Sequence, residues 1–177
     1  MDIKYAKAMD ATIKLLGISK KENENVYAMV APMFLNSNHP LFNINDVFNG
    51  IYVRGNVLGD VRFYGRRAGK LPTARGVVAD VVDDAKHVDT NIMTNWSSKK
   101  LHLTSIYQSE HRFFVRVKGE KEDNKDKIAE IFGEVTELTP EGISGEYGFV
   151  TSKMKEIDYK EKASQLDHIL NMIRVGF

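Results

Sequence analysis

Hydrophobic positions recur along the N-terminal half of the chain with two spacings, which predict where helices and strands lie. Apolar residues three apart predict a helix over residues 2–9 with Asp2 as its N-cap. Two apolar runs, 12–18 and 26–30, flank a short polar run and predict a β-hairpin. A short helix at 44–48 and then a second pair of strands are expected. The strands of this pair are predicted at 51–53 and 61–64.

Prolines and a stripe of small apolar side chains define the next part of the pattern. Pro32 and Pro40 each argue against a central strand at their own positions. Thr73 is placed to cap a helix, and Pro72 favours an extended Leu71, so a sharp turn into that helix is expected. One face of this helix carries an apolar stripe of Val77, Val78, Val81, Val82 and Ala85.

The C-terminal part predicts a compact module. The polar stretch 90–100 marks a boundary, giving domains 1–95 and 96–177. Beyond it we expect strands at 113–117, 135–138, 147–153 and 173–175, and helices at 125–132 and 163–172. This order is that of a ferredoxin-like βαββαβ fold. The fold class is therefore α+β, a mixed sheet with helices followed by this module, which is small enough to need a neighbour or a second copy.

Composition narrows the class without naming a function. The chain has 177 residues, a formal net charge of +1 and no cysteine. The charge gives no reason to expect nucleic acid or a membrane surface as a partner, and the absence of cysteine fits a reducing compartment. The N-terminus shows no apolar signal segment, and no stretch is long enough to cross a bilayer, so a cytoplasmic protein is expected. The five histidines are scattered without metal-ligand spacing, so no metal site is predicted.

The stretch 64–85 raises a question of chemistry. Gly65 and Gly69 can adopt backbone angles closed to other residues, and Gly69 would let a ligand approach the main chain. The unpaired amides of a first helical turn favour an anion or a polar oxygen. The alternative is structural, with Gly69 only making the turn and Thr73 only capping.

The stretch 64–82 closely resembles the YGxGAGxxPTAxxVVADIV signature of homoserine dehydrogenases. Asp2-Ile3 with Thr12-Ile13-Lys14-Leu15-Leu16, and His39-Pro40-Leu41 with Val47-Phe48-Asn49, resemble further segments of that family in order and spacing. Residues 111–177 resemble the ACT module that many members carry, most clearly at 127–133. The chain is thus similar to the C-terminal part of such an enzyme: the end of the catalytic and dimerisation domain plus an ACT-like domain.

The resemblance implies an oxidoreductase that interconverts L-homoserine and L-aspartate semialdehyde with NAD or NADP, in threonine and methionine biosynthesis. It implies Gly69 as the main cofactor contact, with Ala68 and Thr73 as second choices, and a homodimer formed through the strands between residues 13 and 64. No Gly-x-Gly-x-x-Gly follows a strand, and the family's catalytic lysine precedes the segment matched by Asp2. We therefore carry over no catalytic residue, expect the chain alone to be inactive, and expect a small-molecule substrate only together with an N-terminal part.

Two departures from the family pattern bear on function. Arg67 replaces a usual glycine and either reaches a phosphate or is simply solvated. Glu122-Asp123 replaces the Pro-Gly turn at which the ACT module receives an amino-acid effector, so effector binding there is expected to be weak or lost. The rival interpretation of the whole chain is a free-standing ACT-bearing regulatory or assembly module without catalysis.

Overall fold

The protein folds into two compact units. The computed structural model describes three stretches of the chain: residues 1–66, 69–90 and 95–177. Unit 1 combines residues 1–42 with residues 101–177, and unit 2 consists of residues 43–100. The units do not follow the sequence boundary expected after residue 95, because the N-terminal hairpin pairs with the C-terminal sheet.

Unit 1 is built on one mixed sheet. Its strands are β1 (Ala11–Glu22), β2 (Asn25–Asn36), β5 (Glu110–Lys118), β6 (Val135–Leu138), β7 (Glu146–Thr151), β8 (Met154–Lys155) and β9 (Ile169–Val175). The order across the sheet is β1-β2-β9-β5-β7-β6, and β8 pairs with β5 off this path. The parallel pair β2–β9, through Met33 and Phe34, joins the N-terminal hairpin to the rest. The other pairings described in this sheet are antiparallel.

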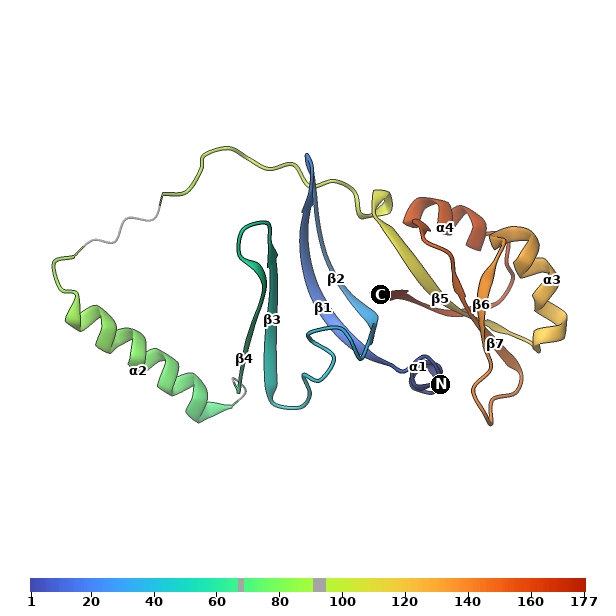
Figure 1. Ribbon diagram of the computed structural model, residues 1–177, viewed down its shortest axis with the longest axis horizontal. Helices are drawn as coiled ribbons and strands as arrows, with labels where there is room; N and C mark the ends of the chain where they lie inside the picture. The colour runs from blue at the N-terminus through green and yellow to red at the C-terminus, as the bar shows by residue number, and fades with distance from the viewer. Residues whose placement is uncertain (67–68, 91–94) are drawn as a thin grey trace. The chain divides into compact units, whose positions relative to one another are not determined.

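The predicted C-terminal module is present within this sheet (Figure 1). Strand β7 lies between β5 and β6, so the first strand–helix–strand unit is split, as in a ferredoxin-like fold. Helices α3 (Lys121–Phe132) and α4 (Glu156–Ala163) supply the crossovers. The predicted α+β class and the order of elements are confirmed, whereas assignment of the module to the ACT type stays a prediction.

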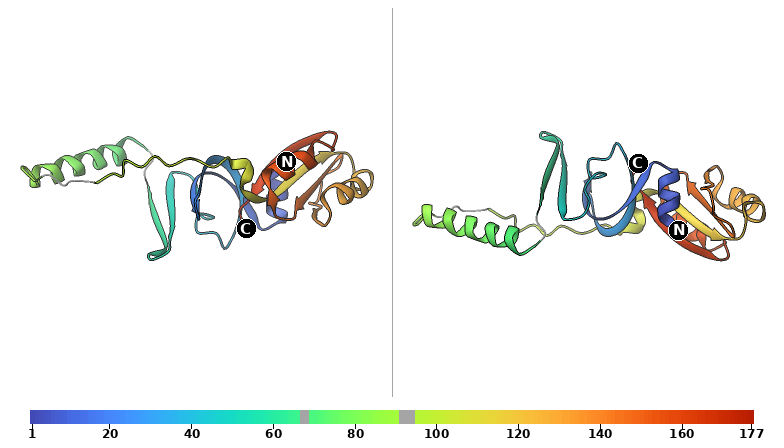
Figure 2. Two further views of the ribbon diagram at one scale, coloured as in Figure 1. Left: turned by 90° about the horizontal axis from the view of Figure 1, so that it is seen from above. Right: turned by 90° about the horizontal axis from the view of Figure 1, so that it is seen from below.

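Both faces of the module's sheet are covered, and the covering elements come from different ends of the chain. Residues Phe113, Val115 and Val117 of β5 pack in one core cluster with Ile128, Phe132 and Tyr159 of α3 and α4. Phe114 points to the opposite face, as alternation along a strand requires. There it packs with residues of α1 (Asp2–Ala8) and β2, and Figure 2 shows α1 on the side of the strands away from α3 and α4.

The second face is closed by three aromatic rings and a polar cluster. The Phe114 ring centroid lies 4.9 Å from that of Phe34 and 5.2 Å from that of Tyr5. Asp2 accepts hydrogen bonds from Arg116 Nε at 2.9 Å and from the Asn171 side chain at 2.9 Å. Because its carboxylate is used in this way, Asp2 does not cap α1. The N-cap is Met1, and the predicted cap was wrong.

The N-terminal hairpin is confirmed and is longer than predicted. Strands β1 and β2 pair over their whole length, from Ala11 opposite Asn36 to Glu22 opposite Asn25. Pro32 lies within β2, opposite Leu15. The prediction that Pro32 does not lie in a central strand is confirmed at this residue, because β2 pairs only with β1 at Pro32 and its pairing with β9 begins at Met33.

The helix predicted at 163–172 was also wrong. Helix α4 lies earlier in the chain and ends at Ala163, and residues 169–175 form β9. The backbone turns at His168, whose φ of 62° is incompatible with a continuous right-handed helix. Beyond it, Met172 and Ile173 pair with Val115 and Phe114 of β5, which fixes this segment as a strand.

Unit 2 contains a hairpin and one helix. Strands β3 (Phe48–Gly55) and β4 (Gly59–Arg66) form the predicted second pair, and α2 spans Lys70–Lys86. The helix predicted at 44–48 is not formed, because Phe48 begins β3, pairs with Arg66 and stacks on Tyr64 at 4.9 Å. Five residues without packing are in any case too few to stabilise a helix.

Substitution of Gly148 tests the packing of α1 on the sheet. A Cβ atom added to Gly148 would meet the Tyr5 ring, with Cδ1 at 2.7 Å. Because Tyr5 is itself buried, Gly148→Ala is expected to lower the free energy of unfolding by about 1–3 kcal/mol in urea titrations. The matched control is Gly17→Ala in β1, where an added Cβ meets nothing within 4 Å and the change should stay below about 0.5 kcal/mol. Equal losses in the two variants would contradict this account.

Candidate functional site

The residues singled out by the sequence lie at the corner between β4 and α2. Gly69 is the N-cap of α2, with φ 116° and ψ 164°. Side chains of L-residues rarely adopt such a φ, so the corner requires glycine. Among the described residues, a Cβ atom built on Gly69 would meet only Pro72 Cδ, at 3.9 Å. The surface of Gly69 is therefore open enough for a ligand to reach the main chain.

Thr73 supports this corner from inside the helix. Its hydroxyl donates to the Gly69 carbonyl at 3.0 Å, and its backbone N–H donates to the same oxygen at 3.3 Å. The prediction that Thr73 is the N-cap was wrong, because α2 begins at Lys70. Leu71 is helical rather than extended. Pro72 is tolerated there because the N–H groups of a first helical turn have no intrahelical acceptor anyway.

The charge around the corner suits an anion. The first turn of α2 holds no acidic residue, and Lys70 lies in it. Arg66, the last residue of β4, and Arg75 add exposed cations nearby in the chain. Together with the helix N-terminus, this arrangement fits a phosphate-bearing group. The other two residues considered at the sequence level, Arg67 and the candidate Ala68, lie outside the described residues.

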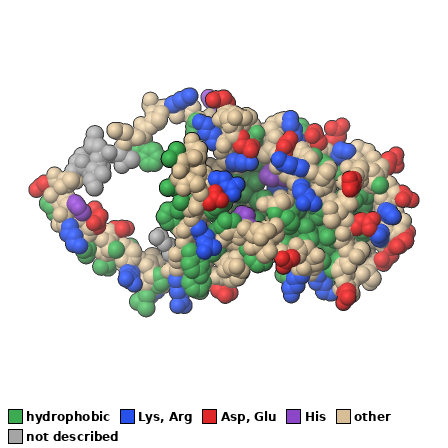
Figure 3. Space-filling view, in the orientation of Figure 1, with side chains coloured by type: hydrophobic (Ala, Val, Ile, Leu, Met, Phe, Trp, Pro, Cys, Tyr) green, Lys and Arg blue, Asp and Glu red, His purple; other side chains and the backbone are tan. Residues whose placement is uncertain are grey.

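The apolar stripe of α2 is exposed. Its spacing is as predicted, but no described residue of α2 is buried, and Val77, Val78 and Val81 are each about three-fifths exposed, at 59%, 60% and 62%. Figure 3 shows hydrophobic side chains uncovered along this helix. An amphipathic helix normally packs its stripe against another element. The stripe is therefore a surface suited to contact with further polypeptide.

The turn before α3, where an amino-acid effector was considered, is filled by the protein's own side chains. The Asn124 side chain donates to the carbonyls of Lys118 and Glu120 at 3.2 and 2.8 Å. Glu120 Oε1 accepts the Gly145 N–H at 2.6 Å. Gly119 has φ 103°, and an added Cβ would lie 2.8 Å from Asn124 Nδ2. The Asn124 contacts occupy the carbonyls of Lys118 and Glu120, and weak effector binding at this turn stays a prediction.

A serine–histidine pair that sequence reasoning missed lies at the start of β5. Ser109 Oγ is 2.9 Å from His111 Nε2 and 2.6 Å from the Ile106 carbonyl. The single hydroxyl proton goes to the carbonyl, so Nε2 is the donor to Ser109 and does not activate it as a nucleophile. Their i, i+2 spacing in a strand was the available signal. The pair is structural, and hydrolase chemistry gains no support.

Two further findings concern metal binding and membrane insertion. Among residues 1–66, 69–90 and 95–177, no group of three or more His, Asp or Glu side chains could hold a metal ion. Within the same residues, no helix is long and apolar enough to cross a membrane.

Comparison with known proteins shows which class of protein shares this fold. Nearly the whole chain superposes on a part of each of two homoserine dehydrogenase structures. A homoserine dehydrogenase from Thiobacillus denitrificans matches 98% of the chain with a TM-score of 0.78 and 20% identity. One from S. aureus matches 99% with a TM-score of 0.73 and 25% identity. The chain spans 44% of each of these structures.

The sequence comparison is more specific for the N-terminal half. A profile of the homoserine dehydrogenase family matches residues 1–82. The homoserine dehydrogenase of Bacillus subtilis is 36% identical over 94 residues, which is 53% of this chain. The predicted resemblance of residues 1–82 to homoserine dehydrogenases is therefore confirmed. The chain spans 22% of the length of the Bacillus subtilis relative.

The half-buried His111 makes stability depend on pH. Burial and, second, Arg174 lower the pKa of His111, while Glu156 opposes the shift; Lys20 and Lys153 also lower it. Below about pH 6.5, the unfolded chain therefore binds a proton at this position more readily than the folded chain. We expect stability to be complete above that pH and to fall as pH drops below it.

Thermal unfolding of His111→Gln at pH 7.5 and pH 5.5 checks this assignment. The variant should lose less stability on acidification than the parent protein. His102→Gln, at an exposed position, is the matched control and should keep the parent's pH dependence. A pH dependence that is the same in all three proteins would assign the effect to other groups.

Proposed function

We propose that this chain is the C-terminal part of a homoserine dehydrogenase and works as such within a complete enzyme. The enzyme would interconvert L-homoserine and L-aspartate semialdehyde by hydride transfer with NAD or NADP, in threonine and methionine biosynthesis. The observation that carries this proposal is the β4–α2 corner. The segment that matches the family most specifically forms a corner with an open glycine, and it leads into a helix whose apolar stripe is uncovered.

Within that enzyme, the corner would lie against the cofactor. Gly69 offers main-chain atoms without a side chain, and Lys70 and the helix N-terminus favour a phosphate. Thr73 would hold the Gly69 carbonyl rather than the cofactor itself. Ala68 remains a candidate on the family pattern alone. The cofactor supplies the hydride chemistry, and this chain's residues would bind and orient it.

The chain by itself would be inactive. It contains no strand followed by Gly-x-Gly-x-x-Gly, and no lysine of the family's catalytic segment is carried over. The exposed stripe of α2 would then be covered by the N-terminal part of the enzyme, because about 60% exposure of successive valines is unfavourable in an isolated helix.

The enzyme would be a cytoplasmic homodimer, with neither nucleic acid nor a membrane as partner. Two features support self-association. β1 is an edge strand of its sheet, and Leu15 and Val30 of the hairpin are 73% and 74% exposed. Unpaired strand edges and apolar faces are the surfaces through which sheets associate. The absence of cysteine fits the reducing compartment.

Complementation tests the proposal directly. The chain is mixed with a separately produced N-terminal half of a homoserine dehydrogenase, and homoserine-dependent formation of NADH or NADPH is followed. Activity that needs both halves supports the proposal, as does a dimer in sedimentation equilibrium. A monomer that restores nothing would favour the regulatory or assembly module instead.

Substitution of Gly69 separates a cofactor contact from a simple turn. In the complemented enzyme, Gly69→Ala is expected to raise the KM for the nucleotide about tenfold, because the methyl group narrows the approach to the main chain and φ 116° is strained. Gly76→Ala on the same helix, where an added Cβ meets nothing within 4 Å, should leave the KM unchanged. If Gly69→Ala lowered stability but left the KM for the nucleotide unchanged, Gly69 would be a turn residue that does not contact the cofactor.

A further inference from the structure

Asn49 is the one asparagine in the sequence that is followed by a glycine, and no aspartate precedes a glycine. The side-chain amide of an asparagine can be attacked by the backbone nitrogen of the next residue. Glycine permits this attack most readily, because it has no side chain beside that nitrogen. The pair Asn49–Gly50, which lies in β3, therefore holds two groups that can react with each other and that the proposed function does not use.

This reaction needs water and no other reactant. The Gly50 nitrogen bonds to Asn49 Cγ and gives up its proton, the side-chain nitrogen leaves as ammonia, and a cyclic succinimide remains. Water then opens one of the two ring bonds to the nitrogen. Cleavage between Cγ and the nitrogen gives aspartate, whereas cleavage at the main-chain carbonyl carbon gives isoaspartate, in which the backbone runs through Cβ and Cγ. Both products carry a carboxylate that is ionised at neutral pH.

The Asn49 side chain is free to react. It is exposed and, within the described part of the chain, makes no hydrogen bond. Its cross-strand partner is Gly65 of β4, which has no side chain. Apart from the chain neighbours of Gly65, no described atom lies within 4 Å of a Cβ atom built on it. Side chains directly opposite each other in antiparallel strands normally contact each other, so this contact is missing and no described contact restrains the amide.

The main chain at Asn49 can leave the strand conformation at little cost. Ring closure requires a rotation of the backbone that a paired strand resists. Strands β3 and β4 form a two-stranded sheet, and no third described strand pairs with them. A hairpin of two strands alone is marginally stable in water. Asn49 belongs to the second pair from its open end, next to the terminal pair Phe48–Arg66, so opening of this end loses few contacts.

One ring contact closes this open end. Phe48 stacks on Tyr64 across the strand pair, with ring centroids 4.9 Å apart. Phe48 and Asn49 point to opposite faces, as neighbours in a strand do, so the stacking holds the backbone and leaves the amide uncovered. Fraying that separates the two rings frees the main chain at Asn49. We propose that Asn49 is a site of spontaneous deamidation, which proceeds when this end of the β3–β4 hairpin frays and yields aspartate and isoaspartate.

Isoaspartate changes the hairpin more than aspartate does. It lengthens the backbone by one atom, so the residues on its two sides no longer keep the same register with β4. The pair Phe48–Arg66 and the stacking on Tyr64 are then lost. Arg66 ends β4 and leads towards the corner at Gly69, so the modification loosens the entry to that corner. The site does not rest on the proposed function, because all of these residues belong to unit 2 and the reaction needs only water.

Peptide mapping by mass spectrometry of the full chain, kept for several days at mildly alkaline pH, tests the proposal. We expect the peptide that contains Asn49 to acquire progressively the small mass increase produced by replacement of NH2 by OH. Hydroxylamine, which attacks a succinimide, should cleave the chain between Asn49 and Gly50. Asn56 is the matched control, because it is exposed in the turn of the same hairpin but is followed by the β-branched Val57, which hinders the attack. An unmodified Asn49, or equal conversion of Asn49 and Asn56, would overturn the proposal.

Two variants separate the chemistry of the site from the opening of the hairpin. Gly50→Ala keeps Asn49 but places a methyl group beside the attacking nitrogen, so conversion should be lost. Phe48→Ala removes the stacking on Tyr64 and should speed conversion about two- to tenfold. Phe177→Ala is the matched control for this variant, because Phe177 is equally exposed, at 38%, but lies in unit 1. Conversion at the parent rate in Gly50→Ala or in Phe48→Ala would contradict the attack by Gly50 or the fraying step, respectively.

Asn49→Asp separates the new charge from the change in the backbone. This variant carries the carboxylate on a normal main chain, so the NMR amide signals of residues 64–66 should shift little. The isoaspartyl form, purified from the aged protein, should show large shifts of the same signals and lose the ring-current shifts of the Phe48–Tyr64 pair. Equal spectra of the two proteins would contradict the change of register.

Discussion

The packing of unit 1 depends on how the sheet face opposite α3 and α4 is covered. Phe114 and Val150 are fully buried on that face, yet neither α3 nor α4 reaches it. Helix α1 and strand β2 cover it, with Tyr5 and Phe34 against Phe114. A module of this size buries too little surface alone to be very stable. The N-terminal segment is therefore a structural part of the C-terminal fold.

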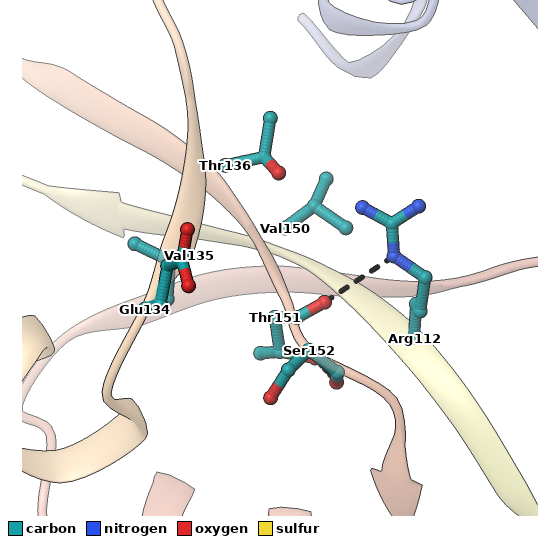
Figure 4. Close-up of a pocket in the computed structure, with 7 residues that line it drawn as sticks. All are labelled: Arg112, Glu134, Val135, Thr136, Val150, Thr151 and Ser152. Atoms are coloured by element: carbon teal, nitrogen blue, oxygen red, sulfur yellow. Dashed lines mark hydrogen bonds between the residues drawn. The ribbon is translucent and has the colours of Figure 1, made fainter.

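The same packing decides where charges can lie. Arg116 is partly buried between α1 and the sheet, and Asp2 and Glu146 neutralise it there. Arg174 is neutralised by Glu156, which is only 2% exposed. Removing one partner of such a pair leaves a buried charge uncompensated. Arg112 lies near the start of β5, outside these two ion-paired groups, and its described hydrogen bond runs to the Thr151 carbonyl (Figure 4).

Unit 2 differs from unit 1 because its elements form between residues close in sequence and bury few side chains. The hairpin β3–β4 and helix α2 match the sequence pattern well, yet α2 contributes no buried residue. The stripe of valines has the periodicity of a packed helix without the packing. In the proposed function this is expected, since the chain spans 44% of the homoserine dehydrogenase structures whose fold it shares. The corner at Gly69 lies within this chain, and in the proposed enzyme the surfaces that contact it would belong to further polypeptide.

The sequence alone determined the elements whose information is local. The apolar runs of β1 and β2, the stripe of α2 and the signature around Gly69 could all be identified from neighbouring residues. These features depend on side-chain spacing and backbone freedom, which a short stretch of sequence contains. The similarity of residues 1–82 to homoserine dehydrogenases could be predicted for the same reason.

The tertiary structure decided those elements whose hydrophobic spacing is compatible with either a helix or a strand. Leu166, Ile169, Leu170 and Ile173 fit a helical stripe, but pairing with β5 makes most of this segment a strand. Pro32 is tolerated in β2 because, at this residue, β2 pairs with β1 on one side and does not pair with β9 on the other. A hollow in unit 1 is lined by residues of β5, β6 and β7 and of the segments next to them, and two of these residues, Arg112 and Ser152, are 40 positions apart in the sequence (Figure 4). No local pattern contains such a juxtaposition, because the sheet register that creates it is set by packing on both faces.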